Sequence, residues 1–193
     1  MPKIVDHDLY RKELLHKSFD LFAEKGYAAI TMRQIAQGLG VSTGTLYHYF
    51  PSKESLFEQL MEEQAQRDIL LATAELERLP SLEEKLAALF EFLQADQDNF
   101  FKRSLLFVDF YQEQQREGKV LSDVLQRVCK RIQETIAALL DIDDPELIIF
   151  ILSYIDGLMW SPIYDHKPIN FARQTEILTR MLTAYLKPAN PQK

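Results

Sequence analysis

The segment at residues 31–53, TMRQIAQGLGVSTGTLYHYFPSK, predicts two short helices joined by a tight turn. Thr31 can accept a hydrogen bond from the backbone of Gln34, whose side chain can bond back, and this reciprocal pair begins a helix at the next residue. Gly40 tolerates the positive φ at which many helices end. Ser42 can then cap a second helix of roughly eight residues, about 12 Å long. The linker between the two helices is therefore almost absent.

The side chains of this segment divide into an inner and an outer face. Ala36 and Gly40 lack bulk where two helices must nearly touch, and Leu46 and Phe50 give the second helix its apolar side. Because a helix of this length matches the width of a DNA major groove, we expect a helix-turn-helix that reads double-stranded DNA. A helical hairpin whose outer tyrosines pack on a neighbour is the structural alternative. The outer polar and aromatic positions are Thr43, Gly44, Thr45, Tyr47, His48 and Tyr49.

The same residues resemble a known family of regulators. The stretch GVSTGTLYHYFPSKESLF, with TMRQIAQGL before it and FAEKGY at the end of the preceding helix, is similar to the DNA-binding domain of TetR-family transcriptional regulators over about residues 8–60. The resemblance implies a homodimer that binds operator DNA, usually as a repressor, and is released by a ligand in its C-terminal domain. It also implies DNA contacts from Arg33, Thr43, Gly44, Tyr47, Tyr49 and Lys53, to which the outer positions Thr45 and His48 are added.

Elementary physical chemistry supports several of these roles. Lys53 follows the expected cap Ser52, so its ammonium and the free N–H groups of the next helix can meet one anion, which in DNA is a phosphate. Arg33 can bind guanine bidentately or hold the DNA backbone, and both remain open. Gly44 removes a side chain where the helix backbone would meet DNA, at a helix-propensity cost of roughly 1 kcal/mol.

The charge balance limits how strongly such a unit can bind DNA. The chain carries a net charge of −7, yet residues 1–60 hold seven Lys or Arg and seven Asp or Glu, so the acidic excess lies after residue 60. We call residues 1–60 the reading unit, and its lack of net charge predicts modest non-specific affinity for DNA. Specificity must then come from a few placed contacts and from the avidity of a dimer.

Apolar spacing, with Pro and Gly between the periodic segments, predicts helices along the whole chain and no convincing strand. The helix before the motif runs from Asp8 to about Lys25 and places Leu14, Leu15, Phe19, Phe22 and Ala23 on one face. The predicted fold is all-α, with a three-helix helix-turn-helix DNA-binding domain at 1–52 and a larger helical ligand-binding and dimerisation domain at 53–193. The later helices are expected at about 53–79, 81–96, 98–116, 119–140, 145–163 and 170–187.

Aromatic residues are concentrated in the C-terminal region, where eight of the twelve Phe lie beyond residue 60. Core packing explains any single one of them, whereas together they can line a ligand pocket with apolar walls and a few polar anchors. A largely apolar effector bound there would shift the long helix that begins near Ser52, and DNA and effector would oppose each other through a coupling energy of about 1–3 kcal/mol. The candidate lining residues are Phe90, Ser104, Phe107, Asp109, Phe110, Tyr111, Tyr154, Asp156 and Trp160.

The helix expected at 145–163 is apolar nearly all round, so it needs a second partner. Because the final helix also carries an apolar stripe, two copies of both helices can form an intermolecular four-helix bundle. Gly157 would permit a close approach, and burial within one chain is the alternative. The expected interface residues are Phe150, Ile151, Tyr154, Leu158, Ile177, Leu178, Met181, Leu182 and Tyr185.

Other functional classes find little support in the sequence. The four His residues lack the spacing of metal ligands, and Asp165 with His166 is an isolated pair without a predicted nucleophile, so no metal, cofactor or catalysis is expected. An enzyme and a helical interaction protein that senses no small molecule remain the alternatives. Cys129 is alone and forms no intrachain disulfide. Without a signal-peptide pattern or an apolar stretch of spanning length, the expected location is cytoplasmic.

Overall fold

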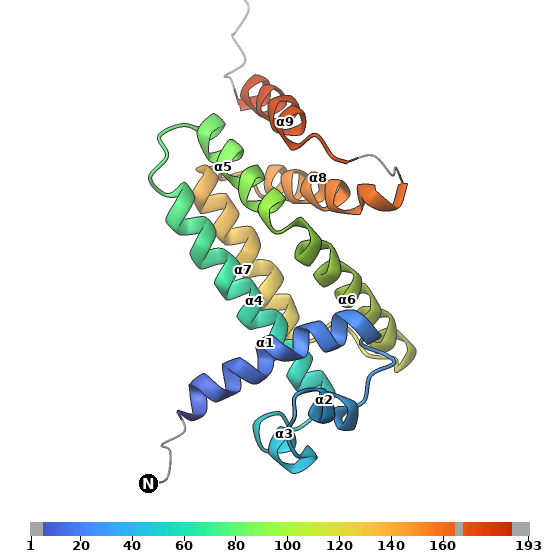
Figure 1. Ribbon diagram of the computed structural model, residues 1–193. Helices are drawn as coiled ribbons and strands as arrows, with labels where there is room; N and C mark the ends of the chain where they lie inside the picture. Colours follow the sequence, from blue (N-terminus) through green and yellow to red (C-terminus); the bar gives the residue numbers. More distant parts are fainter. Residues whose placement is uncertain (1–5, 165–167, 187–193) are drawn as a thin grey trace, which may run out of the picture. The chain divides into compact units, whose positions relative to one another are not determined.

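The computed structural model describes residues 6–164 and 168–186, and all regular structure in these ranges is α-helical (Figure 1). The expectation of an all-α chain is therefore confirmed. Helix α7 begins later than expected, because Gly118 takes φ 70° and Ser122 caps the helix. The end expected for the last helix at residue 187 lies outside the described residues. The helices are α1 (His7–Lys25), α2 (Met32–Gly38), α3 (Thr43–Tyr49), α4 (Lys53–Leu76), α5 (Leu82–Ala95), α6 (Gln97–Arg116), α7 (Asp123–Leu140), α8 (Pro145–Tyr164) and α9 (Phe171–Leu186).

The chain divides into two compact units. Unit 1 comprises residues 1–68 and 102–132, and unit 2 comprises residues 69–101 and 133–193. Helices α4, α6 and α7 each continue from one unit into the other. The units do not follow the expected boundary at 52–53, because the first part of α4 and the segment 102–132 group with the N-terminal helices. The domains at 1–52 and 53–193 stay a prediction about which part reads DNA and which part binds a ligand.

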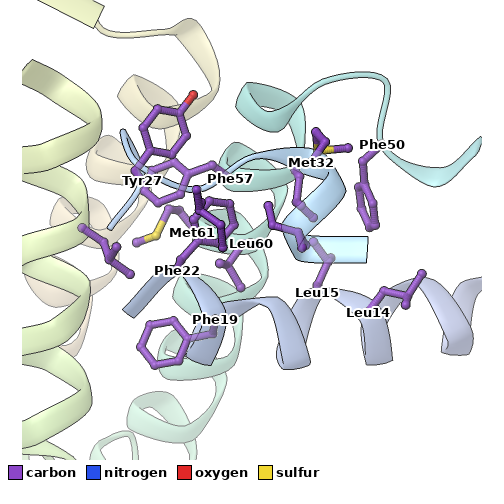
Figure 2. Close-up of a cluster of buried hydrophobic side chains, with 14 of the residues drawn as sticks. Leu14, Leu15, Phe19, Phe22, Tyr27, Met32, Phe50, Phe57, Leu60 and Met61 are labelled. Atoms are coloured by element: carbon purple, nitrogen blue, oxygen red, sulfur yellow. The ribbon is translucent and has the colours of Figure 1, made fainter. Parts of the chain in front are cut away.

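Unit 1 is built around four aromatic rings from four different segments. Phe22 comes from α1, Tyr27 from the following loop, Phe57 from α4 and Phe110 from α6. The rings of Phe57 and Phe110 stack with centroids 4.7 Å apart, and Tyr27 meets these two rings edge-on at 5.0 and 4.8 Å. Figure 2 shows Tyr27, Phe57 and Phe22 gathered with Met61. Each aromatic pair of this kind adds about 0.5–1.5 kcal/mol beyond the burial of its apolar surface.

Helix α1 packs on this cluster through the face that its apolar spacing predicts. Leu14, Leu15, Phe19 and Phe22 are all 7% exposed or less. The helix begins one residue earlier than expected, because Asp6 accepts hydrogen bonds from the backbone N–H groups that follow it. The apolar face of α1 therefore lies where the sequence places it.

The helix-turn-helix follows the expected capping scheme at the start of α2. The backbone N–H of Gln34 donates to Thr31 Oγ1 at 3.3 Å, and the Gln34 side chain accepts from the Thr31 N–H at 2.9 Å. Gly40 has φ 70°, but a Cβ added there would meet nothing within 4 Å, so Gly40 is required for its backbone conformation and not for close packing. The close approach occurs at Gly38, where an added Cβ would lie 2.6 Å from the end of the Leu21 side chain.

Unit 2 contains one helix that its own chain covers poorly. Helices α5 and α9 pack together, with Phe90 and Phe171 edge-on at 6.5 Å. Helix α8 is the one described helix long and apolar enough to cross a membrane by length and composition, a test that core helices of soluble proteins also pass. Only 28% of its 18-residue apolar window is buried. A large part of an apolar helix therefore stays accessible.

Two glycines of the helix-turn-helix should respond in opposite ways to the same substitution. Gly40→Ala forces a side chain into φ 70°, which should cost about 1–2 kcal/mol of unfolding free energy. Gly44 is helical, and its added methyl group would lie 3.7 Å from Ser42 Oγ, so Gly44→Ala should leave stability unchanged or raise it by up to about 1 kcal/mol. Urea unfolding of both variants checks this, and equal effects would contradict the assigned backbone roles.

Candidate nucleic-acid interface

The outer side of α3, with one residue of α2, forms an exposed polar and aromatic surface. Leu46 is fully buried on the inner side of α3, while Tyr47 on the outer side is 49% exposed. About half of Tyr47 is therefore accessible from outside the protein. We call this surface the α3 face, and its members are Arg33, Thr43, Gly44, Thr45, Tyr47 and His48.

Gly44 is the most informative member of the α3 face. It is exposed, it is helical, and the only neighbour that an added Cβ would meet is Ser42 Oγ at 3.7 Å. Nothing inside the protein therefore requires a glycine here, although glycine costs about 1 kcal/mol in a helix. The missing side chain leaves the backbone of α3 open to close contact from outside.

Thr45 takes part in the cap of α3 and is only half-exposed. Its backbone N–H donates to Ser42 Oγ at 2.9 Å, and the two hydroxyl groups lie 2.8 Å apart. This geometry fixes the start of α3, as the sequence predicts for Ser42. Thr45 can still offer its methyl group or hydroxyl oxygen to a ligand beside Gly44.

Tyr49 is half-buried at the end of α3, where it contacts α1, and its expected DNA contact stays a prediction. Its hydroxyl group is 2.8 Å from His7 Nδ1, and its ring meets the Tyr10 ring edge-on at 5.6 Å. Both partners belong to α1, and Tyr49 therefore joins α3 to α1. His7 is thus a residue that sequence reasoning missed as a support of α3, because its partner is 42 positions away.

Lys53 contacts the loop after α1 in this structure, and the phosphate contact expected of it on DNA stays a prediction. Its ammonium donates to the backbone oxygen of Tyr27 at 2.8 Å and to that of Ala28 at 3.4 Å, and it lies 4.4 Å from the centroid of the Tyr27 ring. Burial lowers the pKa of this ammonium, while the carboxylates of Glu113 and Asp109 partly oppose the shift. The side chain is turned into unit 1 because the loop after α1 offers carbonyl oxygens at that point.

Within unit 1, several of the pocket residues expected on α6 contact the core or the backbone. Phe110 is fully buried in the aromatic cluster, and Phe107 packs against the same core. Asp109 accepts a hydrogen bond from the Ala28 N–H at 3.1 Å, so its carboxylate serves the backbone. Tyr111 is 44% exposed, and Ser104 is half-buried. Phe107 and Phe110 therefore contribute to the core, and the pocket expected from the residues of α6 stays a prediction.

The expected pocket residues of unit 2 have separate partners in this structure, and their role as a pocket stays a prediction. Phe90 pairs with Phe171, Trp160 meets Phe101 edge-on at 5.9 Å, and the hydroxyl of Tyr154 donates to Gln174. Asp156 lies exposed on α8. A groove of about 180 Å³ occurs in unit 1, and none of its lining residues was suggested as a pocket residue by the sequence: Glu62, Ala65, Gln66, Arg127, Val128 and Arg131.

The expected dimer residues separate into buried and exposed sets. Ile151, Leu178 and Leu182 are at most 1% exposed, so the chain itself covers them and they are not available to a second copy. Their apolar spacing is the same as that of surface positions, which is why the sequence could not separate the two sets. Tyr154, Leu158 and Ile177 are half-buried. Phe150, Met181 and Tyr185 are 42%, 50% and 67% exposed.

No cluster of three or more His, Cys, Asp or Glu side chains that could hold a metal ion occurs within residues 6–164 and 168–186. Asp165 and His166, the pair considered for catalysis, lie outside the described residues. Cys129 is half-buried on α7.

Comparison with known proteins agrees with the sequence resemblance. Residues 14–60 match the family of bacterial regulatory proteins described as the tetR family. The transcriptional repressor KstR2 of Mycobacterium tuberculosis is 43% identical over 79 residues, which cover 37% of this chain and 40% of KstR2. This match thus spans well under half of that relative. The transcriptional regulator BetI of Rhizobium meliloti is 28% identical over 193 residues, covering 97% of this chain and 94% of BetI.

A solved structure extends the likeness over most of the chain. The transcriptional regulator FadR of Bacillus subtilis, in complex with stearoyl-CoA, aligns with a TM-score of 0.63 and 20% identity, covering 89% of this chain and 96% of FadR. At this identity the likeness concerns the fold. KstR2, BetI and FadR are all named as regulators or repressors, in agreement with the expectation that the chain is not an enzyme.

The two tyrosines of α3 should differ when each loses its hydroxyl group. Tyr49→Phe removes the hydrogen bond to His7 and should lower the free energy of unfolding by about 0.5–1 kcal/mol. Tyr47→Phe removes an exposed hydroxyl and should change it by less than about 0.5 kcal/mol. Thermal unfolding of both variants measures the difference, and a larger loss for Tyr47→Phe would contradict the placement of the two rings.

Proposed function

Because the chain belongs to the TetR family of bacterial regulatory proteins, we propose that it is a ligand-responsive transcriptional regulator. In this proposal it represses transcription by binding operator DNA as a homodimer, and a small effector releases it. The proposed location is the cytoplasm, where a regulator of this kind meets its operator. The reading surface is the α3 face.

The observation that carries the DNA-binding proposal is the open space at Gly44. No contact inside the protein requires a glycine at this position, which is exposed on α3 between Thr43 and Tyr47. A DNA backbone or base edge brought against α3 would supply the missing reason, because a side chain there would hold the two apart. Arg33, Tyr47 and His48 then surround the contact with donors and aromatic rings that can reach base edges or phosphates.

A homodimer is proposed because α8 and α9 leave apolar side chains exposed. These define the α8–α9 face, and they are Ile149, Phe150, Met181, Tyr185 and Leu186, each 42–67% exposed. A second copy would bury them in a symmetric contact. Dimerisation would also place two neutral reading units on one operator, which compensates for their weak attraction to phosphates.

A small, largely apolar effector is proposed to bind within unit 2. The core of this unit is made of Leu, Ile and Phe side chains. Among the described residues, the buried hydroxyl groups of Ser161 on α8 and Thr179 on α9 have no hydrogen-bond partner. Buried polar groups usually have one, so an effector with a carbonyl or hydroxyl group would satisfy them. The complex of FadR with stearoyl-CoA, in a similar fold, supports an acyl-bearing ligand.

Selection from a random library of DNA duplexes tests the reading surface. The wild-type protein should enrich a two-fold symmetric sequence, because a homodimer presents two α3 faces. Gly44→Ala should weaken binding to the selected duplex by about tenfold, equivalent to about 1.4 kcal/mol, while the protein stays as stable as the wild type. Equal affinity of Gly44→Ala and wild type would remove Gly44 from the interface.

Sedimentation equilibrium tests the dimer. Met181→Glu places a charge on the α8–α9 face and should raise the dimer dissociation constant by at least tenfold, because burying an unpaired carboxylate costs more than about 1.4 kcal/mol. Val120→Glu is the control, since Val120 is 78% exposed but lies in unit 1. If the Met181→Glu variant stayed dimeric while the Val120→Glu variant dissociated, the interface would lie elsewhere.

A further inference from the structure

The loop between α1 and α2 is held from two sides by charged side chains of distant helices. From α6, Asp109 Oδ2 accepts a hydrogen bond from the Ala28 N–H at 3.1 Å. From the first turn of α4, Lys53 Nζ donates to the backbone oxygen of Tyr27 at 2.8 Å and to that of Ala28 at 3.4 Å. The Tyr27–Ala28 backbone is thus bound to an acceptor from one helix and to a donor from another.

The local conformation is shaped around this contact. Gly26 ends α1 with φ 79° and ψ 155°, a conformation that side-chain-bearing residues rarely adopt. A Cβ added to Gly26 would also lie 3.0 Å from Asp109 Oδ2. Two independent constraints, one on the backbone and one on the space beside it, therefore favour glycine where the carboxylate of Asp109 reaches the loop.

The aromatic cluster and an outer ion pair hold the same region. The Tyr27 ring packs edge-on against Phe57 and Phe110, so the loop cannot move without breaking these contacts. Beyond the end of α6, Lys119 forms an ion pair with Glu54 in the first turn of α4 at 3.1 Å. The loop that leads into α2 and α3 is therefore fixed to the start of α4 and to α6 within unit 1.

We propose that Asp109 and Lys53 are positioning residues for DNA binding, which hold the Tyr27–Ala28 backbone and through it set the placement of the α3 face. This inference rests on the proposed function and deepens it, because neither side chain lies on the α3 face. Because the reading unit carries no net charge, long-range attraction to DNA phosphates contributes little to its affinity. The affinity then depends on α2 and α3 already having the conformation that binds DNA. A protein that populates the binding-competent arrangement only in part loses apparent affinity by that fraction.

The two possible roles of Lys53, holding the loop or contacting a phosphate, predict different salt dependences of DNA affinity for Lys53→Ala. If Lys53 met a phosphate, Lys53→Ala would lower the slope of log affinity against log salt by about one. As a positioning residue, Lys53→Ala should lower affinity at every salt concentration and leave the slope unchanged. Measurement of binding to one selected duplex between low and moderate salt separates these two roles.

Asp109 is tested with full-length variants on a duplex that the wild-type protein selects from a random library. Asp109→Ala removes the acceptor and should weaken binding by about tenfold, or about 1.4 kcal/mol, at a temperature where circular dichroism shows the variant to be folded. Asp109→Asn keeps an oxygen for the Ala28 N–H and should recover most of the loss. Glu113→Gln is the matched control, because Glu113 lies one turn away on α6, also acts on Lys53 by its charge, and pairs with Arg116 instead of the loop. Its affinity should stay within about twofold of the wild type.

Amide hydrogen exchange at Ala28 shows whether the loop contact has been lost. Faster exchange in Asp109→Ala together with unchanged DNA affinity would overturn the proposal, since the contact would then be only structural. An equal loss in Glu113→Gln would overturn it as well, because charge on α6 alone would explain the effect. Should Asp109→Ala fail to fold, the comparison of Asp109→Asn, Glu113→Gln and Lys53→Ala decides the question. A wild-type protein that enriches no duplex would instead contradict the proposed function itself.

Discussion

The packing of Phe22, Tyr27, Phe57 and Phe110 is the contact on which the rest of unit 1 depends. Each ring comes from a different segment, so one cluster joins α1, the loop after it, α4 and α6. Helices α2 and α3 have only seven residues each, whereas isolated helices shorter than about 12–15 residues are marginal in water. Their stability must come from packing on this frame. The short helices that carry the α3 face are therefore held in place by aromatic contacts outside them.

Polar contacts around the aromatic cluster add direction to this packing. Apolar burial is strong but non-directional, whereas the hydrogen bonds of Asp109 and Lys53 to the Tyr27–Ala28 backbone fix where the chain turns from α1 toward α2. The bond between His7 and Tyr49 similarly fixes the end of α3 on α1. Residues 1–60 carry no net charge, so the proposed DNA binding would depend more on accurate placement of α3 than on attraction by a basic surface.

Unit 2 presents a different physical situation. Its helix α8 is apolar nearly throughout but is covered only in part, and α9 adds Met181 and Tyr185 to the exposed apolar surface. Exposed apolar area of this kind is costly in water and is commonly buried by association. The same unit also holds the buried, unpartnered hydroxyls of Ser161 and Thr179. Both features are explained if unit 2 gains contacts from outside the chain, from a second copy on its surface and from a ligand within.

The sequence by itself determined the helices, the turn and the exposed side of α3, because these depend on residues a few positions apart. The Thr31 and Ser42 caps act on N–H groups within three residues, and the apolar period of α1 needs no distant partner. Tertiary structure alone decided what the longer side chains touch. Lys53 and Asp109 meet a loop 25 to 81 positions away, and Gly38 meets α1 where Gly40 was expected to be the close approach. Packing of distant segments selects such partners, and no local pattern encodes which segments will meet.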